Sequence, residues 1–192
     1  MSTTRRVVVG FIASLCLGLA ACGSEGPRLT TPPGAASEDQ PRVHLGDTVT
    51  IGSMFGCLDR AGTVTITDIA AVDPVGLEVT GWGLRPNPFW EGAPPSPPNL
   101  TGIGGQITVV HKTLSRLGFT ADYPIHAKCG DHGEGYEFAV QVEKTTAGEA
   151  GASSWVVTYK TGDETRKLGF PLAVKLCNEK VSWSTKCNAL KV

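Results

Sequence analysis

The densest group of chemically active side chains lies in residues 126–134, which read His-Ala-Lys-Cys-Gly-Asp-His-Gly-Glu. Imidazole and carboxylate groups of this kind are ligands for copper or zinc. However, a cysteine held in a disulfide cannot bind metal, and no methionine follows Met54 to act as an axial ligand. Aspartate and glycine are also ordinary turn residues. We therefore expect no metal cofactor, and His126, Asp131 and His132 are the residues of an alternative metal-binding or redox function.

Enzyme motifs are missing from the sequence. It contains no G-x-S-x-G, no H-E-x-x-H and no G-x-x-x-x-G-K-[ST] segment. No serine or free thiol is singled out beside a histidine and a carboxylate, as a nucleophile would be. We expect a protein that is not an enzyme and that carries no cofactor. A hydrolase with an unrecognised site is the alternative.

A proline-rich segment offers a binding surface instead. Residues 85–101 hold six prolines and the adjacent pair Phe89 and Trp90. Stiff backbone loses little entropy on contact with a partner, and tryptophan is favoured at binding hot spots. We predict that Arg85, Phe89 and Trp90 contact a partner; in the alternative interpretation the two aromatic side chains fold back onto the domain.

The first 22 residues carry an export signal. Arg5 and Arg6 precede an apolar run from Val7 to Ala20, which is too short for a membrane-spanning helix. The run ends in Leu-Ala-Ala-Cys, the pattern of a bacterial lipobox, so we expect residues 1–21 to be removed and Cys22 to be acylated. The lipid would anchor the protein to the outer face of the cytoplasmic membrane. The net charge is −1 and no basic cluster is present, which argues against a nucleic-acid partner.

Four cysteines remain after Cys22, and in an oxidising compartment an even number predicts two disulfides. Three connectivities are possible. We prefer Cys57–Cys129 and Cys177–Cys187. Cys177 is out of phase with the inward residues before it, whereas Cys57 is in phase with Phe55 and would cross between sheets.

The elements that must position these residues are β-strands. Apolar and polar residues alternate with a period of two in residues 48–55, 63–67, 75–80, 107–109, 136–143, 155–160 and 168–176, with Pro171 favouring an edge or bulge in the last. A short helix is possible around 111–117. We predict an all-β, antiparallel sandwich of seven or eight strands over 42–178. A flexible tether over 22–41 precedes it and an extension over 179–192 follows it.

A resemblance can be stated on these motifs. The lipobox, the polar tether, the segments 45–51, 63–66 and 85–88, and the closing residues 170–177 resemble small immunoglobulin-like lipoproteins of high-GC Gram-positive bacteria. The resemblance implies an immunoglobulin-like fold and an extracytoplasmic location. We therefore expect a binding or accessory module of the cell envelope, whose partner is another envelope protein or a cell-wall component.

Overall fold

The computed structural model describes residues 25–31, 36–40, 42–87, 109–130 and 135–178. Strands dominate these ranges, which confirms the all-β prediction. The strands are β1 (Leu29–Thr30), β2 (Ala36–Gln40), β3 (Thr48–Leu58), β4 (Thr65–Val72), β5 (Leu77–Pro86), β6 (Val109–Val110), β7 (Tyr136–Lys144), β8 (Ala150–Ala152), β9 (Ser154–Thr161), β10 (Glu164–Phe170) and β11 (Leu172–Leu176). A 3-10 helix, η1 (Ser115–Leu117), lies where a short helix was predicted. The described residues include no helix with the length and apolarity to cross a bilayer.

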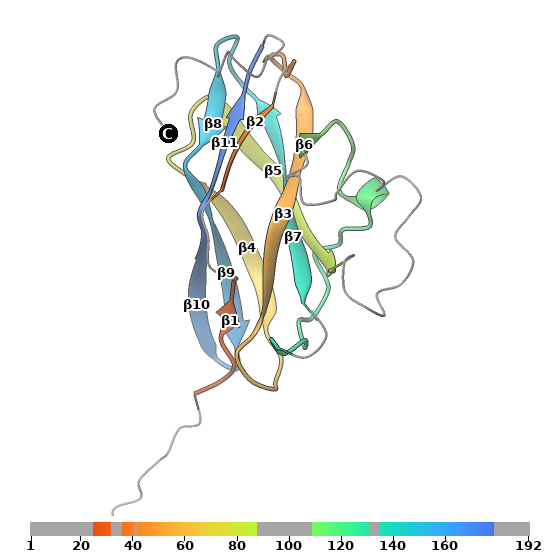
Figure 1. Cartoon of the computed structure of the whole chain (residues 1–192), viewed down its shortest axis with the longest axis vertical. Helices are drawn as coiled ribbons and strands as arrows, with labels where there is room; N and C mark the ends of the chain where they lie inside the picture. The colour runs from red at the N-terminus through yellow and green to blue at the C-terminus, as the bar shows by residue number, and fades with distance from the viewer. Residues whose placement is uncertain (1–24, 32–35, 41, 88–108, 131–134, 179–192) are drawn as a thin grey trace, which may run out of the picture.

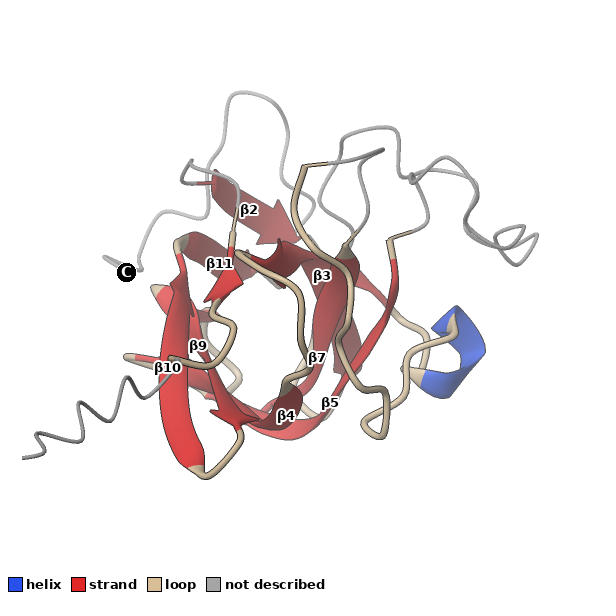
Figure 2. Cartoon of the chain, turned by 90° about the horizontal axis from the view of Figure 1, so that it is seen from below, coloured by secondary structure: helices blue, strands red, loops and turns tan. Residues whose placement is uncertain are grey.

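The strands form two layers (Figures 1 and 2). One sheet has the order β1-β3-β7-β5, with β6 also paired to β3. The other layer consists of β10-β9-β4, and it continues into β2-β11-β8. Single residues, Ser153 and Pro171, separate β8 from β9 and β10 from β11. Proline cannot donate a ladder hydrogen bond, so the predicted irregularity at Pro171 is the point where the chain passes from one sheet to the next.

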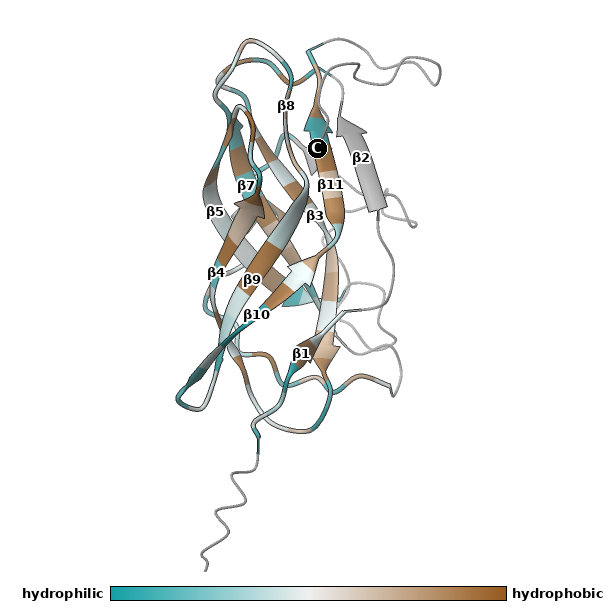
Figure 3. Ribbon diagram, turned by 90° about the vertical axis from the view of Figure 1, so that its left-hand side faces the viewer, coloured by the Kyte–Doolittle hydropathy of each residue, from teal (hydrophilic) through white to brown (hydrophobic). Residues whose placement is uncertain are grey.

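The core lies between the layers, and the period-two pattern of the sequence accounts for it. Figure 3 shows brown, hydrophobic bands alternating with paler ones along β9. The first sheet contributes Val49, Ile51, Phe138, Val140 and Val142, and the second contributes Ile66, Ile69, Trp155, Val157 and Tyr159. The rings of Phe138 and Phe170 lie 5.5 Å apart and join the layers. Tilted aromatic contacts of this kind add to the stability that area burial supplies.

A β-bulge in β3 changes which residues face inward. The register with β7 shifts between Ile51 and Met54. Ser53 adopts a positive φ of 64°, which non-glycine residues rarely accept outside bulges and turns. Met54 is therefore buried, whereas Phe55 is only half-buried. The prediction that Phe55 and Cys57 point inward is wrong, because strict alternation cannot anticipate an inserted residue.

The predicted strand number and the purely antiparallel arrangement also need correction. The described residues hold eleven strands instead of seven or eight. The predicted run 168–176 divides into β10 and β11 at Pro171, and the prediction did not include β1, β2 or β8. One pairing is parallel: β2 runs alongside β11, from Ala36 opposite Leu172 to Gln40 opposite Leu176. Every other strand pair is antiparallel among the residues described.

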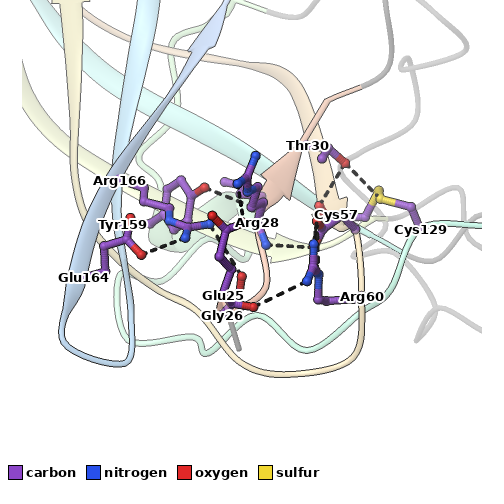
Figure 4. A network of polar contacts seen from close by, with 12 residues as sticks. Glu25, Gly26, Arg28, Thr30, Cys57, Arg60, Cys129, Tyr159, Glu164 and Arg166 are labelled. Atoms are coloured by element: carbon purple, nitrogen blue, oxygen red, sulfur yellow. Dashed lines mark hydrogen bonds and ion pairs between the residues drawn. A yellow bond between two sulfur atoms is a disulfide. The ribbon is translucent and has the colours of Figure 1, made fainter. Parts of the chain in front are cut away.

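The predicted tether over 22–41 is wrong for much of its length, because β1 and β2 belong to the sheets. Leu29 is buried, and its backbone N–H donates to the Tyr159 hydroxyl at 3.2 Å. Figure 4 shows the surrounding polar contacts at the lower end of the domain. The Arg28 N–H donates to Asp59 at 2.8 Å, and the Asp59 N–H donates back to the Arg28 carbonyl at 2.9 Å. Residues 28–30 are thus ordered by pairing with β3 and with Asp59, which lie far away in the sequence. The polar composition of the segment does not reveal this pairing.

Candidate functional site

Arg85, predicted to contact a partner, is instead buried on β5. Its side chain is paired with Glu137, the residue opposite it on β7. Arg85 Nε donates to Glu137 Oε2 at 2.8 Å, and a terminal nitrogen donates to the Leu117 carbonyl at 2.6 Å. The guanidinium also lies 4.4 Å from the centre of the Phe119 ring. The prediction for Arg85 is therefore wrong, because its charge and donors are already used inside the domain.

The physical reason is that the outer face of this sheet is covered. Leu117 and Phe119 pack with Ala139 in a small second core, with Leu114 at its margin. Glycine permits this close approach: a Cβ on Gly83 would lie 2.9 Å from the Phe119 Cβ. Residues 114–119, which include η1, therefore act as a lid over the sheet and shield the Arg85–Glu137 pair from water.

The other predicted contact residues, Phe89 and Trp90, lie outside the described residues, so their role stays a prediction. Asp131, His132, Cys22 and Cys187 lie outside them as well. His126 is exposed, and its Nδ1 lies 3.1 Å from the Thr63 hydroxyl. In the described ranges, no three His, Cys, Asp or Glu side chains are grouped in a way that could hold a metal ion.

The predicted disulfide between Cys57 and Cys129 is confirmed. It links β3 to the segment that precedes β7, where the Leu58 N–H donates to the Ala127 carbonyl and the Cys129 N–H donates to the Leu58 carbonyl, both at 2.8 Å. The bond does not cross between the two layers as expected, because the bulge in β3 turns Cys57 away from the core. Cys177 is buried and disulfide-bonded, and Cys187, its predicted partner, lies outside the described residues.

A groove that sequence reasoning missed lies between β4 and β5, where the two layers meet without pairing. Its volume is about 540 Å³, and residues 68–71, Pro74 and residues 77–82 line it. Pro74, in the connection between β4 and β5, belongs to the lining, and the next residue, Val75, pairs with Gly151. Beyond the lining residues, the segment that follows η1 bridges the two walls: Thr120 pairs with Leu84 of β5, and Ile125 pairs with Val64, which precedes β4.

Bulges on both strands keep their edges from accepting another strand. The register of β4 shifts between Ile66 and Asp68, and that of β5 shifts between Val79 and Gly81. The intervening hydroxyls bond back to the neighbouring strands: Thr67 donates to the Thr158 carbonyl at 3.2 Å, and Thr80 donates to the Gln141 carbonyl at 3.3 Å. Bulged edges resist edge-to-edge pairing, so a ligand here would be held by side chains.

The lining of the groove is acidic with one large aromatic group. Asp68 and Glu78 are exposed carboxylates, Trp82 is half-buried, and none of the lining residues is basic. Glu143 on β7 lies directly opposite Glu78 and is not part of the lining. Like charges placed opposite each other reduce stability, which suggests that this arrangement serves something other than folding.

No local signal in the sequence marks this groove. Its two walls pair with β9 and β7 and not with each other, so their proximity arises only when the layers close. Gly81 interrupts the alternation of β5 just before Trp82, which is the one hint the sequence contains. Searches with the chain find no matching protein-family model and no matching curated protein.

Proposed function

We propose that the chain is an extracytoplasmic lipoprotein, anchored by acylated Cys22 to the outer face of the cytoplasmic membrane, and that its domain is a binding or accessory module of the cell envelope. The export pattern in residues 1–21 supports this location. The Cys57–Cys129 disulfide supports it independently, because disulfides persist mainly in oxidising compartments.

The fold proposed for this module is immunoglobulin-like. Around the groove, the spatial order of the strands is β9-β4-β5-β7. In chain order these strands are β4, β5, β7 and β9, so the fourth, β9, returns to lie beside the first, β4, as in a Greek key. The position of the disulfide outside the core departs from the usual immunoglobulin arrangement.

The groove between β4 and β5 carries the binding proposal. Pockets that bind small ligands combine apolar walls with a few placed polar groups, and a largely apolar lining that includes Trp82, Asp68 and Glu78 fits that description. Carboxylates repel polyanions and accept hydrogen bonds from hydroxyl groups. We therefore assign the groove to an uncharged, hydroxyl-rich ligand, of the kind that the glycan of a cell wall supplies.

Cosedimentation with purified, protein-free cell wall tests this ligand. The mature chain, solubilised in detergent, should sediment with the wall, and prior digestion of the wall with a glycan hydrolase should abolish sedimentation. The double variant Asp68→Asn/Glu78→Gln should lose binding. The matched control Asp122→Asn/Asp163→Asn removes two exposed carboxylates elsewhere and should bind normally.

Two results would count against the groove. If the chain does not sediment with the wall, a glycan ligand is rejected. If Trp90→Ala abolishes sedimentation while the groove variant binds normally, the segment after β5 is the binding surface instead. Anchoring is tested separately by metabolic labelling with a fatty-acid analogue, which should label the parent chain and not the Cys22→Ser variant.

A further inference from the structure

Lys144, at the end of β7, has a fully buried side chain in a position where a charge is costly. Its exposed fraction is 0%. Nζ donates to the Val43 carbonyl at 2.8 Å, to the Leu176 carbonyl at 3.3 Å and to Asn178 Oδ1 at 2.6 Å. Each acceptor is neutral. Burial accordingly lowers the pKa of Lys144, although Glu149 and Asp47 act in the opposite direction.

The backbone around Lys144 fixes the position of its amine. The Val43 N–H donates to the Cys177 carbonyl at 2.9 Å, which holds the chain before β3 against the end of β11. The Gly46 N–H donates to the Lys144 carbonyl at 2.8 Å, and the Lys144 N–H donates to the Asp47 carbonyl at 3.0 Å. The amine therefore has a defined location relative to the residues that follow β11.

The side-chain amide of Asn178 is oriented toward this amine. Its Oδ1 accepts the hydrogen bond from Lys144, and its Nδ2 donates to the Ala147 carbonyl. Because Nζ lies 2.6 Å from Oδ1 and a C=O bond is about 1.23 Å long, the Asn178 Cγ lies within about 4 Å of the amine. Positioning of this kind is what accelerates reactions between held groups.

A third group completes the arrangement. Glu149 is two residues beyond Ala147, and its Oε2 is buried without a hydrogen-bond partner. A buried carboxylate oxygen without a partner is costly, so its retention calls for an explanation. Among the carboxylates that act on Lys144, Glu149 has the largest effect. Its charge favours the protonated amine, so Glu149 acts on this site electrostatically.

We propose that Lys144 and Asn178 become joined by an intramolecular isopeptide bond and that Glu149 transfers the protons. The neutral Lys144 amine attacks Cγ of Asn178, and a Cγ–Nζ bond forms. Glu149 accepts a proton from Nζ and delivers it to Nδ2. The Cγ–Nδ2 bond then breaks, ammonia leaves, and Glu149 returns to its starting state. One amide replaces another, so the step needs no oxidant, reductant or cofactor.

The bond would fasten the end of one layer to the end of the other. Lys144 ends β7 in the first sheet, and Asn178 follows β11 in the second layer. The link lies beside the disulfide-bonded Cys177, so two covalent ties would secure this end of the domain. Its formation does not depend on what the groove binds, and it can be tested apart from the proposed function.

Peptide mapping of the full chain, extracted from membranes and reduced, is the direct test. Trypsin should fail to cleave after Lys144, and the peptides containing Lys144 and Asn178 should appear as one branched species that is lighter than their sum by one ammonia. Glu149→Gln should yield two separate peptides while far-UV circular dichroism stays unchanged. Glu143→Gln, an exposed glutamate beside Lys144, is the matched control and should retain the branched species.

Cleavage after Lys144 and a separate, unmodified Asn178 peptide in the folded parent chain would overturn the proposal and leave Lys144 as an ordinary buried ammonium. Loss of ammonia from the Asn178 peptide alone would also overturn it, because the asparagine would then have cyclised on its own backbone. A branched peptide that persists in Glu149→Gln would refute the role of Glu149.

Discussion

Replacement of Arg85 by methionine separates a structural role from a binding role. Methionine retains much of the unbranched stem that passes Phe119 but removes the charge and the hydrogen-bond donors. Glu137 is then left with one described hydrogen bond, from the Ser53 N–H to Oε1 at 2.9 Å. The side chains of the pair are only 6% and 2% exposed, so water does not replace the lost partner.

The expected cost is large. Removal of one member of a buried ion pair costs about 3–5 kcal/mol, because the remaining charge stays buried without compensation. For a chain of this size that corresponds to a fall in melting temperature of roughly 6–20 °C. A surface substitution is usually within about 0.5 kcal/mol of neutral, and Arg116→Met, an exposed arginine on the same lid, should show this smaller effect.

Urea unfolding followed by tryptophan fluorescence measures both effects, and a double-mutant cycle isolates the pair. Glu137→Gln should destabilise the parent chain, because the neutral amide no longer balances Arg85. In the Arg85→Met background the same change removes the unpaired charge and keeps an acceptor for the Ser53 N–H, so it should be neutral or stabilising. The coupling between the two sites should exceed about 1 kcal/mol.

Two outcomes would refute this interpretation. If Glu137→Gln costs the same free energy in both backgrounds, the two side chains are not coupled. If Arg85→Met leaves the free energy of unfolding unchanged and abolishes partner capture, Arg85 is a contact residue as the sequence first suggested, and the covered sheet face described above is wrong.

Three further predictions concern the disulfide, the bulge and the lower end of the domain. Cys57→Ser/Cys129→Ser should lose about 4 kcal/mol of stability in urea unfolding, because the bond closes a separation of 72 residues; a loss below about 1 kcal/mol would contradict this. Ser53→Gly should be at least as stable as the parent in thermal melts and Ser53→Val should cost about 1–2 kcal/mol, since φ is 64° there; the reverse order would argue against the bulge. The pKa of Asp59 is held below its ordinary value of 3.8, mainly by the hydrogen bond from the Arg28 N–H and next by the one from the Arg60 side chain. The Asp59 carboxylate therefore stabilises the fold above pH 3.8, and this stability is lost as the pH falls through the lowered pKa. The protection of the Leu29 and Thr30 amides, that is, the ratio of intrinsic to observed hydrogen-exchange rate, should fall in that window in the parent and should not show this step in Asp59→Asn. The same pH dependence of protection in both chains would contradict the assignment.

The sequence alone determined the fold class, and it favoured the Cys57–Cys129 pair without excluding the other two connectivities. Alternation in residues 136–143 and 155–160 places Phe138, Val140, Trp155 and Val157 in the core, because successive side chains of a strand point to opposite faces whatever the strand pairs with. The break at Pro171 was also readable, since proline lacks the N–H that a ladder requires. The alternation and the break at Pro171 are properties of short segments, so they follow from the residues of the segment itself.

Tertiary structure decided everything that depends on partners distant in the chain. Arg85 in a proline-rich segment looked exposed, but a lid more than thirty residues away covers it and Glu137 neutralises it. Leu29, in a segment with the composition of a tether, is ordered by β3 and Tyr159. The groove beside Trp82 and the approach of Lys144 to Asn178 arise only when two layers close on each other. No pattern within a strand encodes these neighbours, because long-range packing chooses them.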